Sequence, residues 1–239
     1  MMRIPADRLH DWNLSPAEAI ALQRQLSTQV VTAGDLTHAC TVAGVDVGFE
    51  DGGRLTRAAV TVFSLAELKP VEMKIARLPT SFPYVPGLLS FRELPAVLAA
   101  FDSISILPDV VLCDGQGIAH PRRFGLACHL GVLLDVPSVG VGKSRLVGKH
   151  AEVGRGRGEQ VPLMVGDECI GMVLRTRRDV RPLFISVGHR TSLPHAVALV
   201  LRCCTRYRLP EPIRAAHAAA SRCREARSPD LSGAGSWQG

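Results

Sequence analysis

The chain lacks any long apolar segment. None of its hydrophobic runs approaches the roughly 20 residues that a helix needs to cross a bilayer. The first residues, Met-Met-Arg-Ile-Pro-Ala-Asp-Arg, also lack the apolar core of a secretory signal. We therefore expect a cytoplasmic protein without a membrane partner.

Paired cysteines are missing as well. The seven cysteines are an odd number, and no two of them form a Cys-x-x-Cys pair. A disulfide framework or a cysteine zinc site needs paired or regularly spaced thiols, so we expect neither. Most of the cysteines stand in apolar runs, which favours small reduced residues of the core.

The composition is that of one packed domain. The 239 residues are 46% hydrophobic and 21% charged, which permits a sizeable core and argues against global disorder. We expect a single α/β domain over residues 1–226. From about Arg227 the chain turns to Ser, Pro and Gly, so residues 227–239 are predicted to form a disordered tail.

Positive charge exceeds negative charge, with a formal net charge of +6. Arginines gather at residues 155–157, 175–181 and 202–208. Such charge can neutralise phosphates and gives affinity without sequence information. The balance is compatible with a nucleic-acid partner or with a basic surface that only faces water, and composition does not choose between them.

The first element with a clear start signal is a helix. Ser15, Pro16 and Glu18 have the spacing of a capping box with proline at the first helical position. Gly34 is expected to end this helix, which we predict to cover the sheet.

Strand patterns then predict a mixed sheet. Three consecutive runs read as strands joined by short turns, and they are residues 41–49, 58–65 and 71–78. A strand, a helix and a second strand follow as a parallel unit, at residues 110–113, 125–134 and 136–142. An antiparallel meander joined to parallel strands and flanked by helices is the expected α/β architecture.

The apolar run of residues 110–113 ends on Asp114 and opens into a turn that contains Gly115, Gly117 and Gly125. In open α/β sheets the loops beyond the C-terminal strand ends form the ligand crevice. Glycines let the backbone approach a flat ligand closely. Asp114 is therefore a functional candidate, although an aspartate that caps a strand-to-helix turn would give the same pattern.

Two other carboxylates are candidates. Asp46 stands among apolar neighbours in the first predicted strand, where an unpaired carboxylate is costly, so it should have a metal ion, an arginine or backbone donors as its partner. Glu93 follows Ser90 by three residues at a predicted helix start, and this spacing suits a capping box equally well. Mg²⁺ takes oxygen ligands and keeps several waters, so two or three converging carboxylates would suffice for phosphodiester hydrolysis.

Two basic residues complete the candidate set. Lys143 follows the strand at 136–142 and is expected at the same sheet edge as Asp114. His217 lies in a helix that Pro212 opens. Lys143 could equally be a positive charge that attracts phosphates in general. A lone helical histidine is usually structural.

Five sequence blocks resemble the endonuclease V family. They are Val45-Asp46-Val47, Pro83-Tyr-Val-Pro-Gly-Leu-Leu-Ser-Phe-Arg-Glu93, Asp114-Gly-Gln-Gly-Ile-Ala-His-Pro-Arg-Arg-Phe-Gly125, Gly140-Val-Gly-Lys143 and Tyr207-Arg-Leu-Pro-Glu-Pro-Ile-Arg-Ala-Ala-His217. The resemblance implies a ribonuclease H-like fold with a central mixed β-sheet. It also implies a DNA repair endonuclease that hydrolyses the second phosphodiester bond 3′ to deoxyinosine, leaving 3′-hydroxyl and 5′-phosphate ends.

The same resemblance implies roles for the candidate residues. Asp46 and Asp114 would bind Mg²⁺, with Mn²⁺ as an alternative ion, and Glu93 would be a further ligand, directly or through water. Lys143 would meet the scissile phosphate or the attacking water, and His217 would assist there. The loop 83–87 is similar to the family's wedge, which fills the gap left by a flipped base. The implied substrate-binding residues are Tyr84, Pro86, Gly87, Leu89, Gly115, Gly117, His120 and Gly125.

Two alternative functions stay open on the sequence. The first is the same chemistry on inosine in RNA, because contacts to the 2′-hydroxyl separate the two substrates. The second is a nucleic-acid-binding protein that does not cut, which the intact set of carboxylates disfavours. We expect a monomer in either case.

Overall fold

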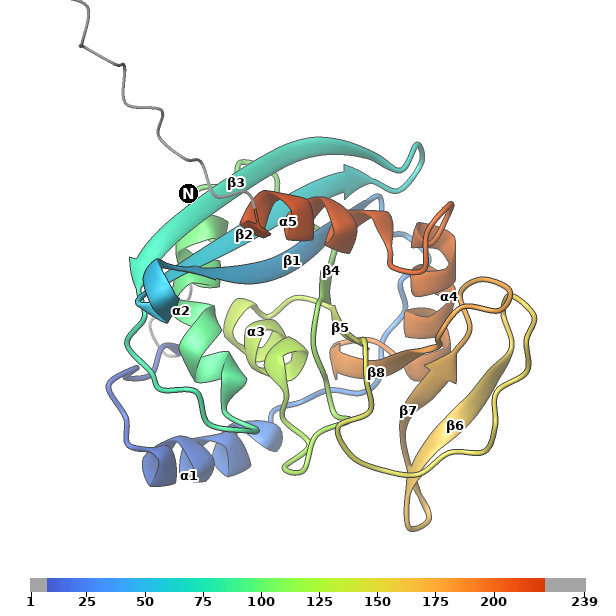
Figure 1. The fold of residues 1–239 in the computed structure, drawn as a ribbon, viewed down its shortest axis with the longest axis horizontal. Helices are drawn as coiled ribbons and strands as arrows, with labels where there is room; N and C mark the ends of the chain where they lie inside the picture. Colours follow the sequence, from blue (N-terminus) through green and yellow to red (C-terminus); the bar gives the residue numbers. More distant parts are fainter. Residues whose placement is uncertain (1–7, 222–239) are drawn as a thin grey trace, which may run out of the picture.

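The computed structural model describes residues 8–221, which form one mixed β-sheet with helices on both faces (Figure 1). The helices are α1 (Pro16–Ser27), α2 (Leu89–Phe101), α3 (Leu126–Leu134), α4 (Leu193–Cys203) and α5 (Glu211–Ser221), with a short 3₁₀ turn, η2 (Asp51–Gly53). The strands are β1 (Thr41–Glu50), β2 (Leu55–Ser64), β3 (Lys69–Pro79), β4 (Val110–Cys113), β5 (Ser138–Gly142), β6 (Gln160–Val165), β7 (Glu168–Leu174) and β8 (Leu183–His189).

The sheet has the order β3-β2-β1-β4-β5-β8-β7-β6. The first three strands form the expected antiparallel meander, and β4 joins β1 in parallel. The strand β5 is parallel to β4, as the strand-helix-strand pattern predicted, and β8 then runs antiparallel to β5. The prediction of a mixed sheet flanked by helices is confirmed.

The alternation of side chains along β1 decides which helix each residue faces. Ala43 and Val45 join a core cluster with α2 and α3, whereas Val42 joins a second cluster with α4 and α5. Gly44 lies under α5, where a Cβ atom would come within 2.1 Å of the Pro212 carbonyl carbon. Asp46 has the same parity as Val42 and Gly44, so its side chain points to the α5 side of the sheet.

The helix α1 begins as predicted but ends early. Ser15 and Glu18 form both hydrogen bonds of the capping box, and Pro16 occupies the first turn. The helix ends at Ser27, not near Gly34. It packs against α3 and not directly on the sheet, so the prediction that it covers the sheet is wrong.

The helix α2 corrects another expectation. It begins at Leu89, and no side chain caps its first turn. Ser90 lies inside the helix with its hydroxyl hydrogen-bonded to His129 Nδ1 at 3.0 Å. The capping box of Ser90 and Glu93 therefore does not form, which leaves the buried Glu93 carboxyl without that structural role.

Four of the six described cysteines, at positions 113, 128, 203 and 204, are buried and free. Cys40 and Cys169 are exposed, so they do not share the core position expected for most of the cysteines. Cys223 and the predicted disordered tail lie outside the described residues. Among residues 8–221 there is no helix long and apolar enough to span a membrane.

Candidate functional site

Asp46 and His217 meet across the interface between β1 and α5. The His217 Nδ1 atom lies 2.6 Å from Asp46 Oδ2, and the backbone N–H of Val47 donates to Asp46 Oδ1 at 2.8 Å. The Asp46 side chain is 12% exposed, whereas that of His217 is 55% exposed. The sequence prediction that Asp46 needs a partner is confirmed, and the partners are an imidazole and a backbone donor.

Asp114 and Lys143 form a second contact at the same place. Asp114 directly follows β4, and its Oδ2 atom is ion-paired with the Lys143 Nζ atom, which follows β5. Because β4 and β5 are parallel neighbours, both side chains lie at one sheet edge, as predicted. Burial and the nearby Asp46 raise the pKa of the Asp114 carboxyl, and Lys143 opposes that rise.

Glu93 is the most deeply buried of the three carboxyls, at 7% exposure. Burial, together with the negative charges of Asp46 and Asp114, raises its pKa to about 8. At neutral pH the free protein therefore holds Glu93 mainly as the protonated acid. Clustered carboxyls that resist ionisation indicate a place where a cation would relieve their repulsion.

Asp46, Asp114 and His217 form the only group of potential metal ligands found in the described part of the chain. Their candidate ligand atoms all lie within 4.8 Å of one another. Glu93 is not in this group, although the charges of both aspartates act on its carboxyl. We call Asp46, Asp114 and His217 the acidic cluster. Its two carboxylates suit a hard divalent cation such as Mg²⁺.

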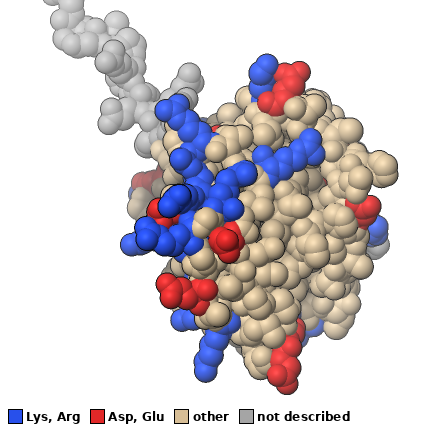
Figure 2. Space-filling model, turned by 90° about the vertical axis from the view of Figure 1, so that its right-hand side faces the viewer, with Lys and Arg blue, Asp and Glu red and all other residues tan. Residues whose placement is uncertain are grey.

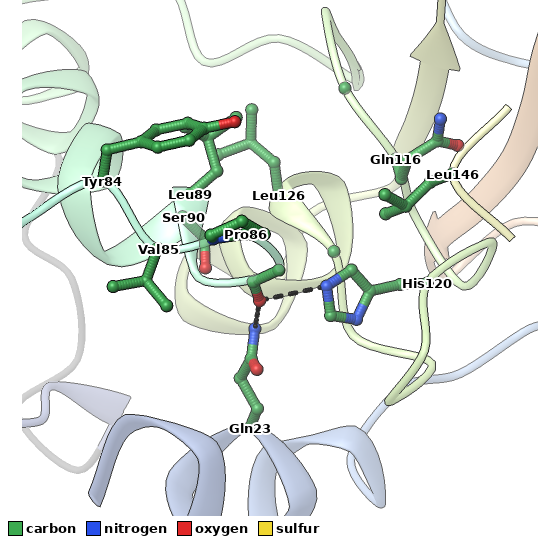
Figure 3. Close-up of a pocket in the computed structure, with 13 residues that line it drawn as sticks. Gln23, Tyr84, Val85, Pro86, Leu89, Ser90, Gln116, His120, Leu126 and Leu146 are labelled. Atoms are coloured by element: carbon green, nitrogen blue, oxygen red, sulfur yellow. Dashed lines mark hydrogen bonds between the residues drawn. The ribbon is translucent and has the colours of Figure 1, made fainter. Parts of the chain in front are cut away.

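A pocket opens beside the acidic cluster and includes Gly115, the residue after Asp114 (Figure 3). Its lining residues come from α1, α2 and α3, from the loop before α2 and from the loops that follow β4 and β5. They are Gln23, Tyr84, Val85, Pro86, Gly87, Leu89, Ser90, Gly115, Gln116, His120, Gly125, Leu126 and Leu146. Seven of the eight predicted substrate-binding residues therefore line one pocket.

Gly117 is the exception. It does not line the pocket, because it lies beneath β8, where a Cβ atom would come within 2.0 Å of the Val187 carbonyl oxygen. Its N–H donates to the Ser186 hydroxyl at 2.8 Å. The structure gives Gly117 a packing role, and its assignment to the substrate-binding set stays a prediction.

The Gly87 carbonyl oxygen joins three segments of the pocket wall by hydrogen bonds. It accepts from Gln23 Nε2 at 3.1 Å, His120 Nε2 at 3.1 Å and Arg122 Nη2 at 2.7 Å. Gly87 has φ of +79°, a conformation that favours glycine. The loop that carries Tyr84 is thereby held to α1 and to the glycine-rich turn after β4.

His120 presents a neutral ring to this pocket. Burial, followed by the charge of Arg122, lowers its pKa to about 4. The backbone N–H of Arg122 donates to His120 Nδ1 at 3.2 Å, so the proton of the neutral ring is on Nε2, which donates to the Gly87 carbonyl. The pocket wall therefore combines backbone polar groups with apolar surface.

Tyr84 is 72% exposed, at the rim of the pocket. Figure 3 shows its ring beside Leu89 and Leu126, while Gln23 reaches the opposite side of the wall from α1. An aromatic ring that covers so little protein surface is free to stack against a ligand.

Gln23 is the functional candidate that sequence reasoning missed. Its side chain is 1% exposed, and it also donates to the Phe124 carbonyl at 3.2 Å and accepts from Arg122 Nε. The sequence does contain a signal, because Gln23 lies on the buried face of α1 between Ala19 and Leu26. A polar residue on an apolar helix face must find partners in the interior.

The sequence matches the family model "Endonuclease V" over residues 24–218. It is 53% identical, over 219 residues, to an endonuclease V of Azotobacter vinelandii. That alignment covers 92% of this chain and 99% of the relative.

Solved structures give the same result. The endonuclease V of Streptomyces avermitilis is similar with a TM-score of 0.84 and 43% identity, covering 92% of this chain and 95% of that one. Endonuclease V of Ciona intestinalis, in complex with a 24mer DNA that contains an inosine followed by a ribo-adenosine, is similar with a TM-score of 0.77 and 28% identity. The alignment covers 85% of this chain and 95% of that one.

Proposed function

The chain belongs to the endonuclease V family, and from that premise we propose which bond it cuts and how its residues share the work. It is a DNA repair endonuclease specific for deoxyinosine. We place the cut at the second phosphodiester bond 3′ to deoxyinosine, with 3′-hydroxyl and 5′-phosphate products. The reduced cysteines favour the cytoplasm as the place of action.

The observation that carries this proposal is the position of the acidic cluster beside the pocket. Three separate elements bring Asp46, Asp114 and His217 within 4.8 Å, and the residue after Asp114 lines the pocket. A base bound in the pocket would therefore hold a nearby phosphate over the carboxylates. Recognition and cutting would occur within one bound segment of the strand.

Asp46 and Asp114 are the proposed Mg²⁺ ligands, and Glu93 is the proposed ligand through water, with Mn²⁺ as an alternative ion. Their oxygen donors fit such an ion. Burial, followed by the negative charge that such an ion would neutralise, raises the pKa values of Asp114 and Glu93. When bound, the ion supplies Lewis-acid activation of water and stabilises the leaving oxygen.

His217 and Lys143 have roles that follow from their contacts. The hydrogen bond to Asp46 fixes the His217 ring with Nδ1 inward, so Nε2 is available to exchange a proton with the attacking water. Lys143 is 40% exposed and remains next to Asp114. Its ammonium can therefore meet a phosphate oxygen and orient the scissile bond without being taken from solvent completely.

In the pocket, the base would be read by backbone groups near Gly87, Gly115 and Gly125, with neutral His120 in the wall. Leu89 and Pro86 supply apolar contact. Tyr84 is the proposed wedge: flipping a base costs a few kcal/mol of stacking, and an inserted ring recovers part of that loss.

A nicking assay tests the function. Purified protein with Mg²⁺ is incubated with a labelled duplex that carries one deoxyinosine, with the matched adenine duplex as control. We expect a single nick on the inosine strand, lost in EDTA and restored by added Mg²⁺. An intact inosine duplex, under conditions in which a family relative cuts, would refute the proposal. Binding to the duplex without any nick would instead favour the non-cutting nucleic-acid binder.

RNA is the second candidate substrate. The bound DNA of the Ciona intestinalis relative carries a ribo-adenosine after its inosine, so ribose at that position fits at least one member of the family. A matched inosine RNA, offered in competition with the DNA, decides the preference. We expect the DNA to be cut faster, and faster cutting of the RNA would reverse the assignment.

A further inference from the structure

Arginines concentrate on three loops outside the acidic cluster and the pocket. Residues 154–159, 175–182 and 204–208 contain eight arginines and only two carboxylates, Glu159 and Asp179. We call these loops the arginine surface. In Figure 2, most of the Lys and Arg side chains gather at the left of the view, while most of the remaining surface in view is uncharged.

Hydrogen bonds hold the three loops together without neutralising their positive charge. Arg157 Nη2 donates to the Cys204 carbonyl at 3.2 Å, and Arg175 Nη2 donates to the Val153 carbonyl at 3.0 Å. Arg177 Nη1 donates to the Arg206 carbonyl, and Arg208 Nε donates to the Arg181 carbonyl at 2.7 Å. Carbonyl acceptors orient a guanidinium but do not cancel its charge.

The charged side chains that remain face water. Arg155 and Arg178 share one carboxylate, Asp179, and their side chains are 81% and 83% exposed. Arg181 and Arg206 are exposed too. The loops therefore hold more positive charge than the fold needs for its own ion pairs.

Sheet topology places this surface at the edge that carries the proposed chemistry. Asp114 follows β4 and Lys143 follows β5. In the pairing of β8 with its neighbours, Phe184 lies opposite Gly142 and Leu183 lies opposite Leu174. The loop 175–182 consequently starts and ends at the edge where β5 ends. The loop 154–159 reaches it too, because Gln160 pairs with Leu174.

A direct contact joins the arginine surface to the acidic cluster. Arg208 Nη2 donates to the Lys143 carbonyl at 2.9 Å, and the Lys143 ammonium is ion-paired with Asp114. The strand order sets the positively charged loops on one side of Asp114, towards β7 and β6. The meander and α2, which carries part of the pocket, lie on the other (Figure 1).

We propose that the arginine surface binds phosphates of the substrate strand beyond the cut, on its 3′ flank. The inference rests on the proposed function, in which the strand runs from the pocket across the acidic cluster. Three strand spacings of about 4.8 Å separate β4 from β7, roughly 14 Å. That span corresponds to about four nucleotides at 3.4 Å each. The surface supplies affinity without reading sequence.

The test uses three arginines whose side chains hold no loop carbonyl. Arg178→Gln, Arg181→Gln and Arg206→Gln are combined in one variant. The matched control removes three positive charges at the far end of the sheet, as Arg54→Gln, Lys69→Gln and Lys74→Gln. Binding to inosine duplexes is measured in EDTA over a series of salt concentrations, and thermal melting checks that both variants fold.

We expect the arginine variant to lower the slope of log affinity against log salt by about 2 to 3, because each lost phosphate contact removes close to one unit. The control variant should keep the wild-type slope. The difference should disappear on a duplex whose 3′ flank ends about two nucleotides past the cut, which is shorter than the span of about four. Shortening the 5′ flank should not remove it.

Each other outcome refutes a specific part of the proposal. A wild-type slope for the arginine variant, or an equal decrease in both variants, would refute the arginine surface as a phosphate site. Sensitivity to the 5′ flank would refute its placement beyond the cut. If the wild-type protein fails to nick inosine DNA with Mg²⁺, the proposed function fails instead, and the binding slopes still report whether these arginines bind phosphates.

Discussion

The acidic cluster and the pocket lie side by side but differ in their chemistry. Asp46 lies on β1 and Asp114 directly follows β4, and with Glu93 they bring three carboxyl groups together. The pocket wall instead holds a neutral histidine, backbone carbonyls and apolar side chains. Concentrated negative charge suits a cation, whereas a neutral wall suits an uncharged base.

The two regions also differ in how they are held. The strand pairing of β1, β4 and β5 fixes the aspartates, so their separation follows from the sheet register. The pocket depends on hydrogen bonds among loops, with Gln23 and Arg122 meeting at the Gly87 carbonyl. Substitutions in the acidic cluster should therefore stop cutting, whereas substitutions around the pocket should weaken recognition.

The largest effect is expected from Asp46→Asn or Asp114→Asn. Each removes a proposed metal ligand while keeping the side-chain shape, so single-turnover nicking should fall by on the order of 10³-fold or more. Binding of inosine duplex in EDTA should stay close to wild type. Full nicking activity in either variant would show that the acidic cluster does not cut.

Gln23→Leu tests the pocket side of the comparison. The loss of the amide removes the Gln23 hydrogen bonds to the Phe124 carbonyl and to Arg122 Nε, at a cost of roughly 1–3 kcal/mol. We expect kcat/KM on inosine duplex to fall about 10- to 100-fold. Gln25→Leu, on the exposed side of α1, is the matched control. An unchanged kcat/KM for Gln23→Leu would separate this residue from recognition.

Tyr84→Ala removes the exposed ring at the rim. Base stacking on an aromatic is worth about 1–3 kcal/mol, so cutting of duplex should fall roughly tenfold. Single-stranded inosine DNA, which needs no wedge, should lose less. Tyr84→Phe keeps the ring and should cut like wild type. Equal losses on duplex and single strand would contradict the wedge.

The last prediction concerns the pH dependence of stability. The pKa of Glu93 is raised from 4.5 to about 8 in the fold. Its contribution to the stability of the metal-free protein is full below pH 4.5 and is lost as pH rises towards 8. Glu93→Gln, which resembles the protonated acid, should therefore gain stability relative to wild type as pH increases over that range. Denaturant unfolding in EDTA measures the difference, and a pH-independent difference would contradict the raised pKa.

Much of the fold and of the acidic cluster could be predicted from sequence, because local patterns carry them. The capping box at Ser15, the meander and the buried strand before Asp114 each depend on neighbours close in the chain. Strand order explains why Asp114 and Lys143 were expected at one edge. Asp46 is a carboxylate in an apolar strand, and this position indicated that its side chain needs a partner.

Tertiary structure alone decided the rest, because those features depend on which distant segments pack together. It made His217 the partner of Asp46 across 171 positions of sequence. It buried Glu93 without a helix cap, put Gly117 beneath β8, and brought Gln23 from α1 into the pocket wall. The sequence by itself determined which groups are able to bind a metal or read a base. The packing of helices on both faces of the sheet determined which of them meet, because burial, charge repulsion and hydrogen bonding act through space.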